Sequence, residues 1–164
     1  FQNYGLVDTD TVEANMKLLH LDSSALSNSS VTRELTAAIV ARWQDKLPQL
    51  QVEYRDLDSQ PLPHLTARSM IQTDPTEAAD AARAMEQFLA ADVLVIKEKK
   101  KNIYIPSTLK AWIDRVAVAG KTFRYTEKGP QGLVGGKKVI IATGSAGIHT
   151  NARTDCQRAY LRHG

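Results

Sequence analysis

The sequence has few of the features that mark an extracellular, membrane or nucleic-acid-binding protein. Cys156 is the only cysteine in the 164 residues, so no internal disulfide can form, which fits a reducing, cytoplasmic compartment. No apolar run is long enough to cross a bilayer, and residues 1–15 lack the basic start and apolar middle of a signal peptide. The net charge of +3 is too small to indicate a nucleic-acid partner. We therefore expect a cytoplasmic chain with neither membrane nor nucleic acid as its partner.

What is present is the composition of one ordinary globular domain. The chain is 43% hydrophobic and 24% charged, and its length suits a single domain with a real core. Met16 is where a natural start would fit, so we interpret 1–15 as an N-terminal extension and 16–164 as the domain. His64 has no second His or Cys at metal-ligand spacing nearby, so we expect it to have a surface or packing role and expect no metal site.

The stretch 16–35 predicts a strand, then a loop of small polar residues, then a helix that begins at Val31. A helix N-terminus offers unpaired N–H groups and the positive end of the helix dipole, and Ser24, Ser30 and Thr32 add hydroxyl donors. A phosphate group fits such a turn. The plainer alternative, favoured by this stretch taken alone, is that the serines only cap the helix.

Strand and helix patterns alternate along the chain. Short apolar or alternating runs predict strands, and apolar residues at helical spacing predict helices. The expected strands are 16–21, 50–57, 93–96 and 139–143; the expected helices are 30–46, 73–90 and 107–119, with a loop over 122–134 and a further helix over 155–162. Such alternation implies an α/β fold, with a parallel sheet, right-handed crossovers and helices on both faces.

The loops that follow the strands predict where a ligand binds. In parallel sheets, ligands bind beyond the carboxyl ends of the strands, where the strand order reverses. The loops 22–32, 97–104 and 144–150 meet that description. The first suits a phosphate, and the other two would hold the group to which the phosphate is attached. The sequence therefore predicts a nucleotide or flavin carrier site.

Several longer motifs carry a family resemblance. They are Arg55-Asp-Leu and Pro61-Leu-Pro63 after the second strand, Pro106-Ser-Thr-Leu-Lys-Ala-Trp-Ile-Asp-Arg115, Gly120-Lys-Thr-Phe-Arg-Tyr-Thr-Glu-Lys-Gly-Pro-Gln-Gly-Leu-Val134 and Gly136-Lys-Lys-Val-Ile-Ile-Ala-Thr143. The chain resembles the flavodoxin-like FMN-dependent NADH:quinone oxidoreductases, or azoreductases, from residue 16 to about 162. The resemblance implies a homodimer with non-covalently bound FMN. It also implies a two-electron ping-pong reaction, in which NADH is the donor and a quinone or azo compound the acceptor, so no side chain is expected to be catalytic.

The resemblance also implies which residues contact the cofactor and the substrate. The implied FMN-binding residues are Ser24, Ser30, Val31, Thr32, Lys100, Lys101, Asn102, Ile103, Gly144, Ser145, Ala146 and Gly147. The first four match the phosphate turn, the middle four a segment along the isoalloxazine ring, and the last four a loop at the ring's polar edge. Tyr125 matches an aromatic residue over the substrate, although a packed loop aromatic is as good an interpretation. The helix 107–119, with Trp112 and Ile113, matches part of a dimer surface.

The ring-binding segment departs from the family pattern. The family reads roughly Gly-Ala-Pro-Met-Tyr-Asn-Phe where this chain has Lys97-Glu-Lys-Lys-Lys-Asn-Ile103. The lysines remove apolar surface on which the ring rests, and burying several ammonium groups would cost several kcal/mol unless they paired with anions. We therefore expect this loop to swing into solvent and FMN binding to weaken. In a milder alternative, the phosphate site remains and a lysine stabilises reduced, anionic flavin.

Two further expectations concern the end of the chain and the function. The family continues through another strand and helix, so we expect the C-terminal strand and helix to be missing and one sheet edge to lack its cover. The alternative function is a non-catalytic relative that keeps the scaffold but has weakened or lost flavin binding. A third hypothesis is that 97–101 binds an acidic partner or a phosphate backbone, although such a run is more often a solvated loop.

Overall fold

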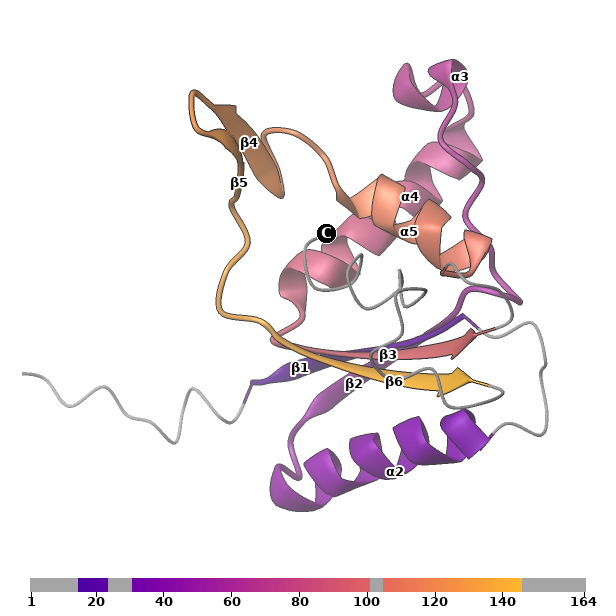
Figure 1. Ribbon diagram of the computed structural model, residues 1–164, viewed down its shortest axis with the longest axis vertical. Helices are drawn as coiled ribbons and strands as arrows, with labels where there is room; N and C mark the ends of the chain where they lie inside the picture. Colours follow the sequence, from indigo (N-terminus) through magenta and orange to yellow (C-terminus); the bar gives the residue numbers. More distant parts are fainter. Residues whose placement is uncertain (1–14, 24–30, 101–104, 146–164) are drawn as a thin grey trace, which may run out of the picture.

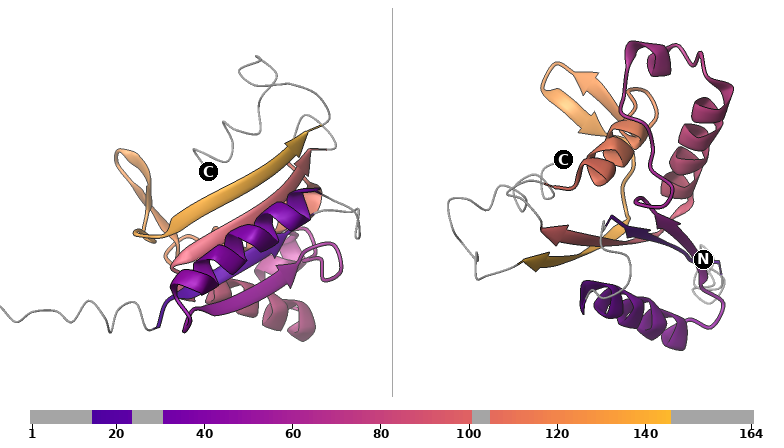
Figure 2. Two further views of the ribbon diagram at one scale, coloured as in Figure 1. Left: turned by 90° about the horizontal axis from the view of Figure 1, so that it is seen from below. Right: turned by 90° about the vertical axis from the view of Figure 1, so that its right-hand side faces the viewer.

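The computed structural model describes residues 15–23, 31–100 and 105–145. Its elements in chain order are β1 (Lys17–Asp22), α2 (Val31–Lys46), β2 (Gln51–Asp56), α3 (Ala67–Met70), α4 (Pro75–Ala90), β3 (Val93–Lys100), α5 (Ser107–Val116), β4 (Phe123–Thr126), β5 (Gly129–Gly132) and β6 (Lys138–Ser145). Helix α2 covers one face of the main sheet, while α4 and α5 cover the other (Figures 1 and 2). The predicted α/β arrangement with helices on both faces is confirmed.

The main sheet is parallel and has the strand order β2-β1-β3-β6. The chain passes from β1 to β2 on one side and then returns across β1 to place β3 on the other side. The point where the order reverses therefore lies between β1 and β3. Of the strands that the structure describes, β6 pairs with β3 alone, and the side chain of Val139 on β6 is half exposed.

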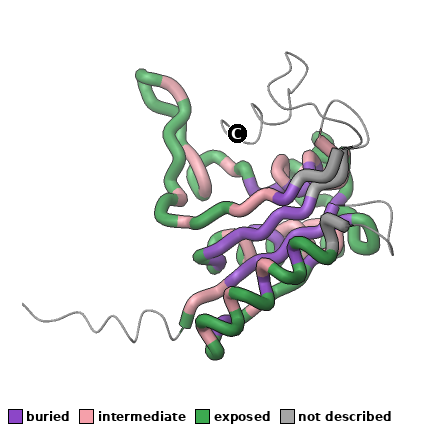
Figure 3. Tube along the Cα trace, turned by 60° about the horizontal axis from the view of Figure 1, so that its bottom comes forward, coloured by how far each residue is buried: buried purple, intermediate pink, exposed green. Residues whose placement is uncertain are grey.

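The two faces of the sheet bury two separate apolar clusters, because successive side chains of a strand point to opposite faces. Leu18, Val93 and Val95 pack with Val40 of α2, and Trp43 packs against this cluster from the same helix. On the other face, one buried cluster joins the sheet to α4 and α5. The strands contribute Leu19, Leu21, Leu94 and Ile96, helix α4 contributes Ala84, and helix α5 contributes Leu109, Trp112 and Val116. Figure 3 shows the resulting buried centre of the sheet. Near-continuous apolar strands such as 93–96 are what burial on both faces requires.

Helix α4 starts where the sequence places it and is fixed to the sheet by a charge pair. Asp74 caps the helix by accepting hydrogen bonds from the N–H groups of Thr76 and Glu77, and Pro75 occupies the first turn. The buried Arg55 of β2 donates through Nη2 to both carboxylate oxygens of Asp80, each at 2.9 Å. This bidentate contact ties α4 to the edge strand β2.

Two local elements were not predicted from the sequence. The loop expected over 122–134 contains the hairpin β4–β5, whose turn is closed by the hydroxyl of Thr126, which donates to the Gly129 carbonyl at 2.7 Å. Strands of four residues with Gly and Pro among them give no alternating signal. Helix α3 is a single turn held by a capping box between Thr66 and Ser69.

The side chain of Trp112 corrects one expectation. It is only 3% exposed and packs edge-on against Phe88, with ring centroids 5.7 Å apart. Trp112 therefore belongs to the chain's own core rather than to a dimer surface.

None of the helices in the described ranges combines the length and the hydropathy that a membrane crossing requires.

Candidate functional site

The candidate site lies at the carboxyl ends of β1 and β3, where the strand order reverses. Ser23, the first residue after β1, donates to the Lys97 carbonyl through its backbone N–H at 3.2 Å and through its hydroxyl at 2.8 Å. The backbone N–H of Leu57, just after β2, donates to the Asp22 carbonyl at 2.7 Å. Three chain segments are thus held together at this edge, which is where ligands bind in open parallel sheets.

A buried ion pair lies directly at this edge. Lys97 Nζ is 3.0 Å from Asp22 Oδ1 and 3.2 Å from Oδ2, and the two side chains are 0% and 1% exposed. The Tyr54 hydroxyl of β2 donates to Asp22 Oδ2 at 3.3 Å. The three residues come from adjacent strands, because Asp22 stands opposite Lys97 in the β1–β3 register and Tyr54 pairs with His20 on the other side.

The structure corrects the expectation that the lysine run swings into solvent for residues 97–100, and Lys101 lies outside the described residues. Strand β3 continues through Lys100 instead of ending at residue 96, and Lys97 is inside the protein. The condition stated from the sequence, that a buried ammonium needs an anion, is met by Asp22. Sequence reasoning missed this pair because its members are 75 residues apart.

The amino end of α2 reaches the same edge from below the sheet. The chain leaves α2 and enters β2 at the opposite end, where the N–H of Gln51 donates to the carbonyl of Met16 at 3.0 Å. Helix α2 therefore runs antiparallel to the strands, and its first turn lies near their carboxyl ends (Figure 1). The amides of the first turn and the positive dipole end of this 16-residue helix are suited to an anion.

The structure gives different amounts of information on the predicted FMN-binding residues. Val31 and Thr32 open α2 as predicted. Gly144 and Ser145 belong to β6 rather than to a loop, and the β3–β6 register places Lys100 opposite Ser145 at the last pair of the ladder. The remaining ones lie outside the described residues: Ser24, Ser30, Lys101, Asn102, Ile103, Ala146 and Gly147.

Tyr125 is not brought to this edge within one chain. It lies on β4, is 76% exposed and meets Phe123 edge-on, with ring centroids 5.3 Å apart. The hairpin β4–β5 projects from the end of the molecule opposite the carboxyl ends of the strands (Figures 1 and 2). A substrate at the carboxyl edge of the same chain is therefore far from Tyr125.

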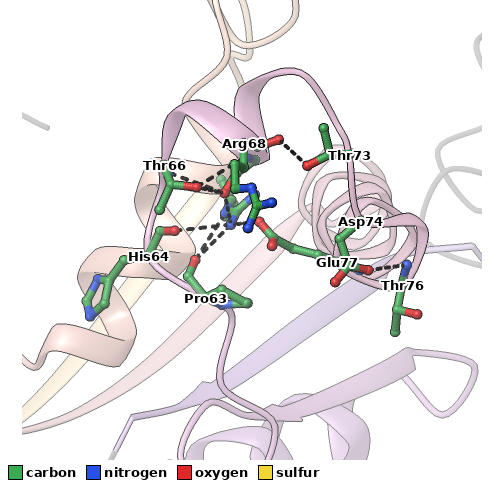
Figure 4. Close-up of polar contacts among 10 residues, drawn as sticks. Pro63, His64, Thr66, Arg68, Thr73, Asp74, Thr76 and Glu77 are labelled. Carbon is green, nitrogen blue, oxygen red and sulfur yellow. Dashed lines mark hydrogen bonds and ion pairs between the residues drawn. The ribbon is translucent and has the colours of Figure 1, made fainter.

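Arg115 of α5 is a second polar centre that the sequence did not single out. It donates through Nε and Nη2 to the Pro63 carbonyl at 3.2 and 2.9 Å, and through Nη2 to Ser69 Oγ at 3.2 Å. It also forms an ion pair with Glu77 at the start of α4, beside the segment that Figure 4 shows. Hydrogen bonds from Ser69 and Arg115 lower the pKa of Glu77 below its ordinary 4.5. This cluster holds the segment between β2 and α4 in place.

Comparisons with known proteins agree with this geometry. A family described as having a flavodoxin-like fold matches residues 16–163. The FMN-dependent NADH:quinone oxidoreductase 1 of Xanthomonas euvesicatoria pv. vesicatoria is 58% identical over 147 residues, which cover 90% of this chain and 76% of that protein. The corresponding Pseudomonas putida protein is 46% identical over 149 residues, covering 85% of this chain and 73% of that protein.

A solved structure supports the same grouping. The azoreductase from Bacillus anthracis str. Sterne superposes with a TM-score of 0.76 at 26% identity, covering 90% of this chain and 78% of that one. The fold, the matched range and the identities agree with one another. The chain therefore belongs to the flavodoxin-like fold family and, within it, to the FMN-dependent NADH:quinone oxidoreductases.

Proposed function

We propose that the chain is an FMN-dependent NADH:quinone oxidoreductase that also reduces azo compounds. The observation that carries the proposal is the position of the α2 amino end at the carboxyl edge of β1 and β3, in a chain 58% identical to a protein of that name. Bound FMN would supply the two-electron transfer between NADH and the acceptor. The protein's own part is to bind and orient the cofactor.

The residues at the edge fit the phosphate end of FMN. The first amides of α2, at Val31 and Thr32, would donate to phosphate oxygens, and Ser24 and Ser30 would add hydroxyl donors. Lys97 places a buried cation at the same edge, although its charge is balanced by Asp22. This set of donors is suited to a phosphate dianion.

We expect the ring end of FMN to lie along 100–103, which begin at the last residue of β3. We expect it also to lie against 144–147, which begin with the last two residues of β6. The register that places Lys100 opposite Ser145 supports a shared position for the two segments. A second candidate function is a non-catalytic relative with weakened or lost flavin binding. The observation in its favour is the departure from the family's apolar sequence at 99–101.

Comparison of FMN with riboflavin tests the cofactor assignment. If the phosphate turn dominates affinity, FMN should bind at least tenfold more tightly than riboflavin, because each 1.4 kcal/mol of added contact is tenfold in Kd. The measurement is a titration of the purified protein with each flavin, followed by flavin fluorescence. Equal affinities, or no binding of either flavin, would contradict the FMN assignment and favour the alternative of a non-catalytic relative.

We also propose a cytoplasmic homodimer in which Tyr125 contacts substrate bound by the second copy. The projecting hairpin and the exposed side chain of Tyr125 support an interface between copies. Light scattering should give about twice the 18.1 kDa of one chain at micromolar concentration, and a stable monomer there would contradict the proposal.

A further inference from the structure

The Lys97–Asp22 pair lies on the face of the sheet that α2 covers. Val93 and Val95 of β3 and Leu18 of β1 pack against this helix, and side chains alternate along a strand. Lys97 and Asp22 are therefore on the same face, at the carboxyl end. Helix α2 lies against β3 and β6, with its buried Thr36 one turn inside its amino end.

The ion pair and the amino end of α2 lie at the same edge of the sheet. Asp22 is the last residue of β1, and the first turn of α2 lies near the carboxyl ends of the strands (Figure 1). The pair is also fully buried, so salt in the solvent screens it much less than it screens surface charges. A charge at this position therefore acts on any anion bound at the amino end of α2.

Asp22 and Lys97 act in opposite directions on a phosphate bound at the amino end of α2. The carboxylate of Asp22 alone would repel a phosphate dianion at the α2 amino end, and the ammonium of Lys97 cancels that field. In a partly buried site with an effective dielectric of about 20, a nearby unit charge changes the affinity for a charged group on the order of tenfold. The resemblance implies glycine at the position where this chain has Lys97.

We propose that Lys97 is a positioning residue that sets the affinity of the α2 amino end for the phosphate group of FMN, by balancing the buried charge of Asp22. The proposal rests on the proposed function for the identity of the ligand. It separates Lys97 from the other lysines of the run. Lys97 strengthens binding at the phosphate, whereas the resemblance implies that Lys100 and Lys101 belong to the segment along the ring.

A charge cycle at the two positions tests the proposal. Lys97→Met should weaken FMN binding about tenfold and leave riboflavin binding within about twofold, because riboflavin has no phosphate. Asp22→Asn should bind FMN at least as tightly as the unmodified chain. The double variant Asp22→Asn/Lys97→Met should return to within about threefold of the unmodified chain, since both charges are gone. Lys138→Met is the matched control, because it removes one charge at the opposite end of the same strand layer, where its Nζ lies over Trp43.

The comparison of Asp22→Asn with the double variant isolates the charge of Lys97, even where Lys97→Met alone does not fold. Equal FMN affinities of these two, or an equal loss of riboflavin binding in Lys97→Met, would overturn the proposal and leave the FMN assignment intact. If the unmodified chain binds no flavin, the proposed function fails, and inorganic phosphate becomes the probe. Protection from thermal unfolding by phosphate that weakens in Lys97→Met would then support the role of Lys97; equal or no protection would overturn it.

Discussion

Exchange of Lys100, Lys101 and Ile103 for Met, Tyr and Phe is expected to lower the Kd for FMN at least tenfold. The exchange restores the apolar surface on which the resemblance places the flavin ring. Burying part of a large aromatic surface stabilises by a few kcal/mol, and each 1.4 kcal/mol is tenfold in Kd. The measurement is FMN affinity by fluorescence, together with NADH-dependent quinone turnover across a range of FMN concentrations. Turnover of the variant should saturate at a correspondingly lower FMN concentration.

The structure determines which residues are left unchanged in this variant. Lys97 stays because it is buried against Asp22 on the face of the sheet that α2 covers. Lys99 stays because β3 lies between β1 and β6 and stays in register with β6 through Lys100, and proline is tolerated in sheets only on edge strands or at bulges.

A charge-only variant separates the two ways in which the lysines act. Lys100→Gln/Lys101→Gln removes both ammonium groups without adding apolar surface, so it should recover much less affinity than the Met-Tyr-Phe exchange. If the unmodified chain already binds FMN tightly and turns over as fast as the exchanged one, the lysine run is no defect. A full gain from the Gln variant would assign the effect to charge rather than to ring contact.

The layers of the fold followed from local patterns, because each element carries its own periodicity. The apolar run 93–96 predicted a strand buried on both faces, and Asp74-Pro75 predicted the start of α4. Trp112 shows the limit of this reasoning. Periodicity identifies the apolar face of a helix, yet it does not say whether that face packs inside the chain or against another copy.

The order of strands and helices along the chain predicted part of the site, and the contacts between distant residues were not predictable from it. The order of strands and helices placed the edge between β1 and β3, and it placed Val31 and Thr32 at the start of α2. It gave no sign that Lys97 is buried, since a lysine after an apolar run reads as the end of the strand. The anion that makes its burial tolerable is brought by parallel pairing with Asp22, which no local pattern encodes. The same reason hid Arg115, whose partners Pro63, Ser69 and Glu77 lie in a different part of the sequence.

Replacement of Arg115 by Met is expected to lower the free energy of unfolding by about 3 kcal/mol. The guanidinium is buried, and its loss leaves the Pro63 carbonyl without its two donated hydrogen bonds and Glu77 without its cation. Removing one partner of a buried charged network costs this much because the other groups keep their desolvation penalty. Urea unfolding at pH 7, followed by the fluorescence of Trp43 and Trp112, measures the change.

Two control variants and one pH dependence make this expectation specific to the buried cluster. Arg83→Met removes an arginine whose side chain is 64% exposed and 3.6 Å from Asp80, so it should cost about 0.5 kcal/mol or less. Arg115→Lys keeps the charge but not the fork of donors, so it should fall between the two. Because the pKa of Glu77 is lowered in the folded state, its stabilisation is present above pH 4.5 and is lost as pH falls through the folded value. The destabilisation caused by Glu77→Gln should therefore be full at pH 7 and shrink below pH 4.5. An Arg115→Met variant no less stable than Arg83→Met would show that the cluster does not hold the segment between β2 and α4.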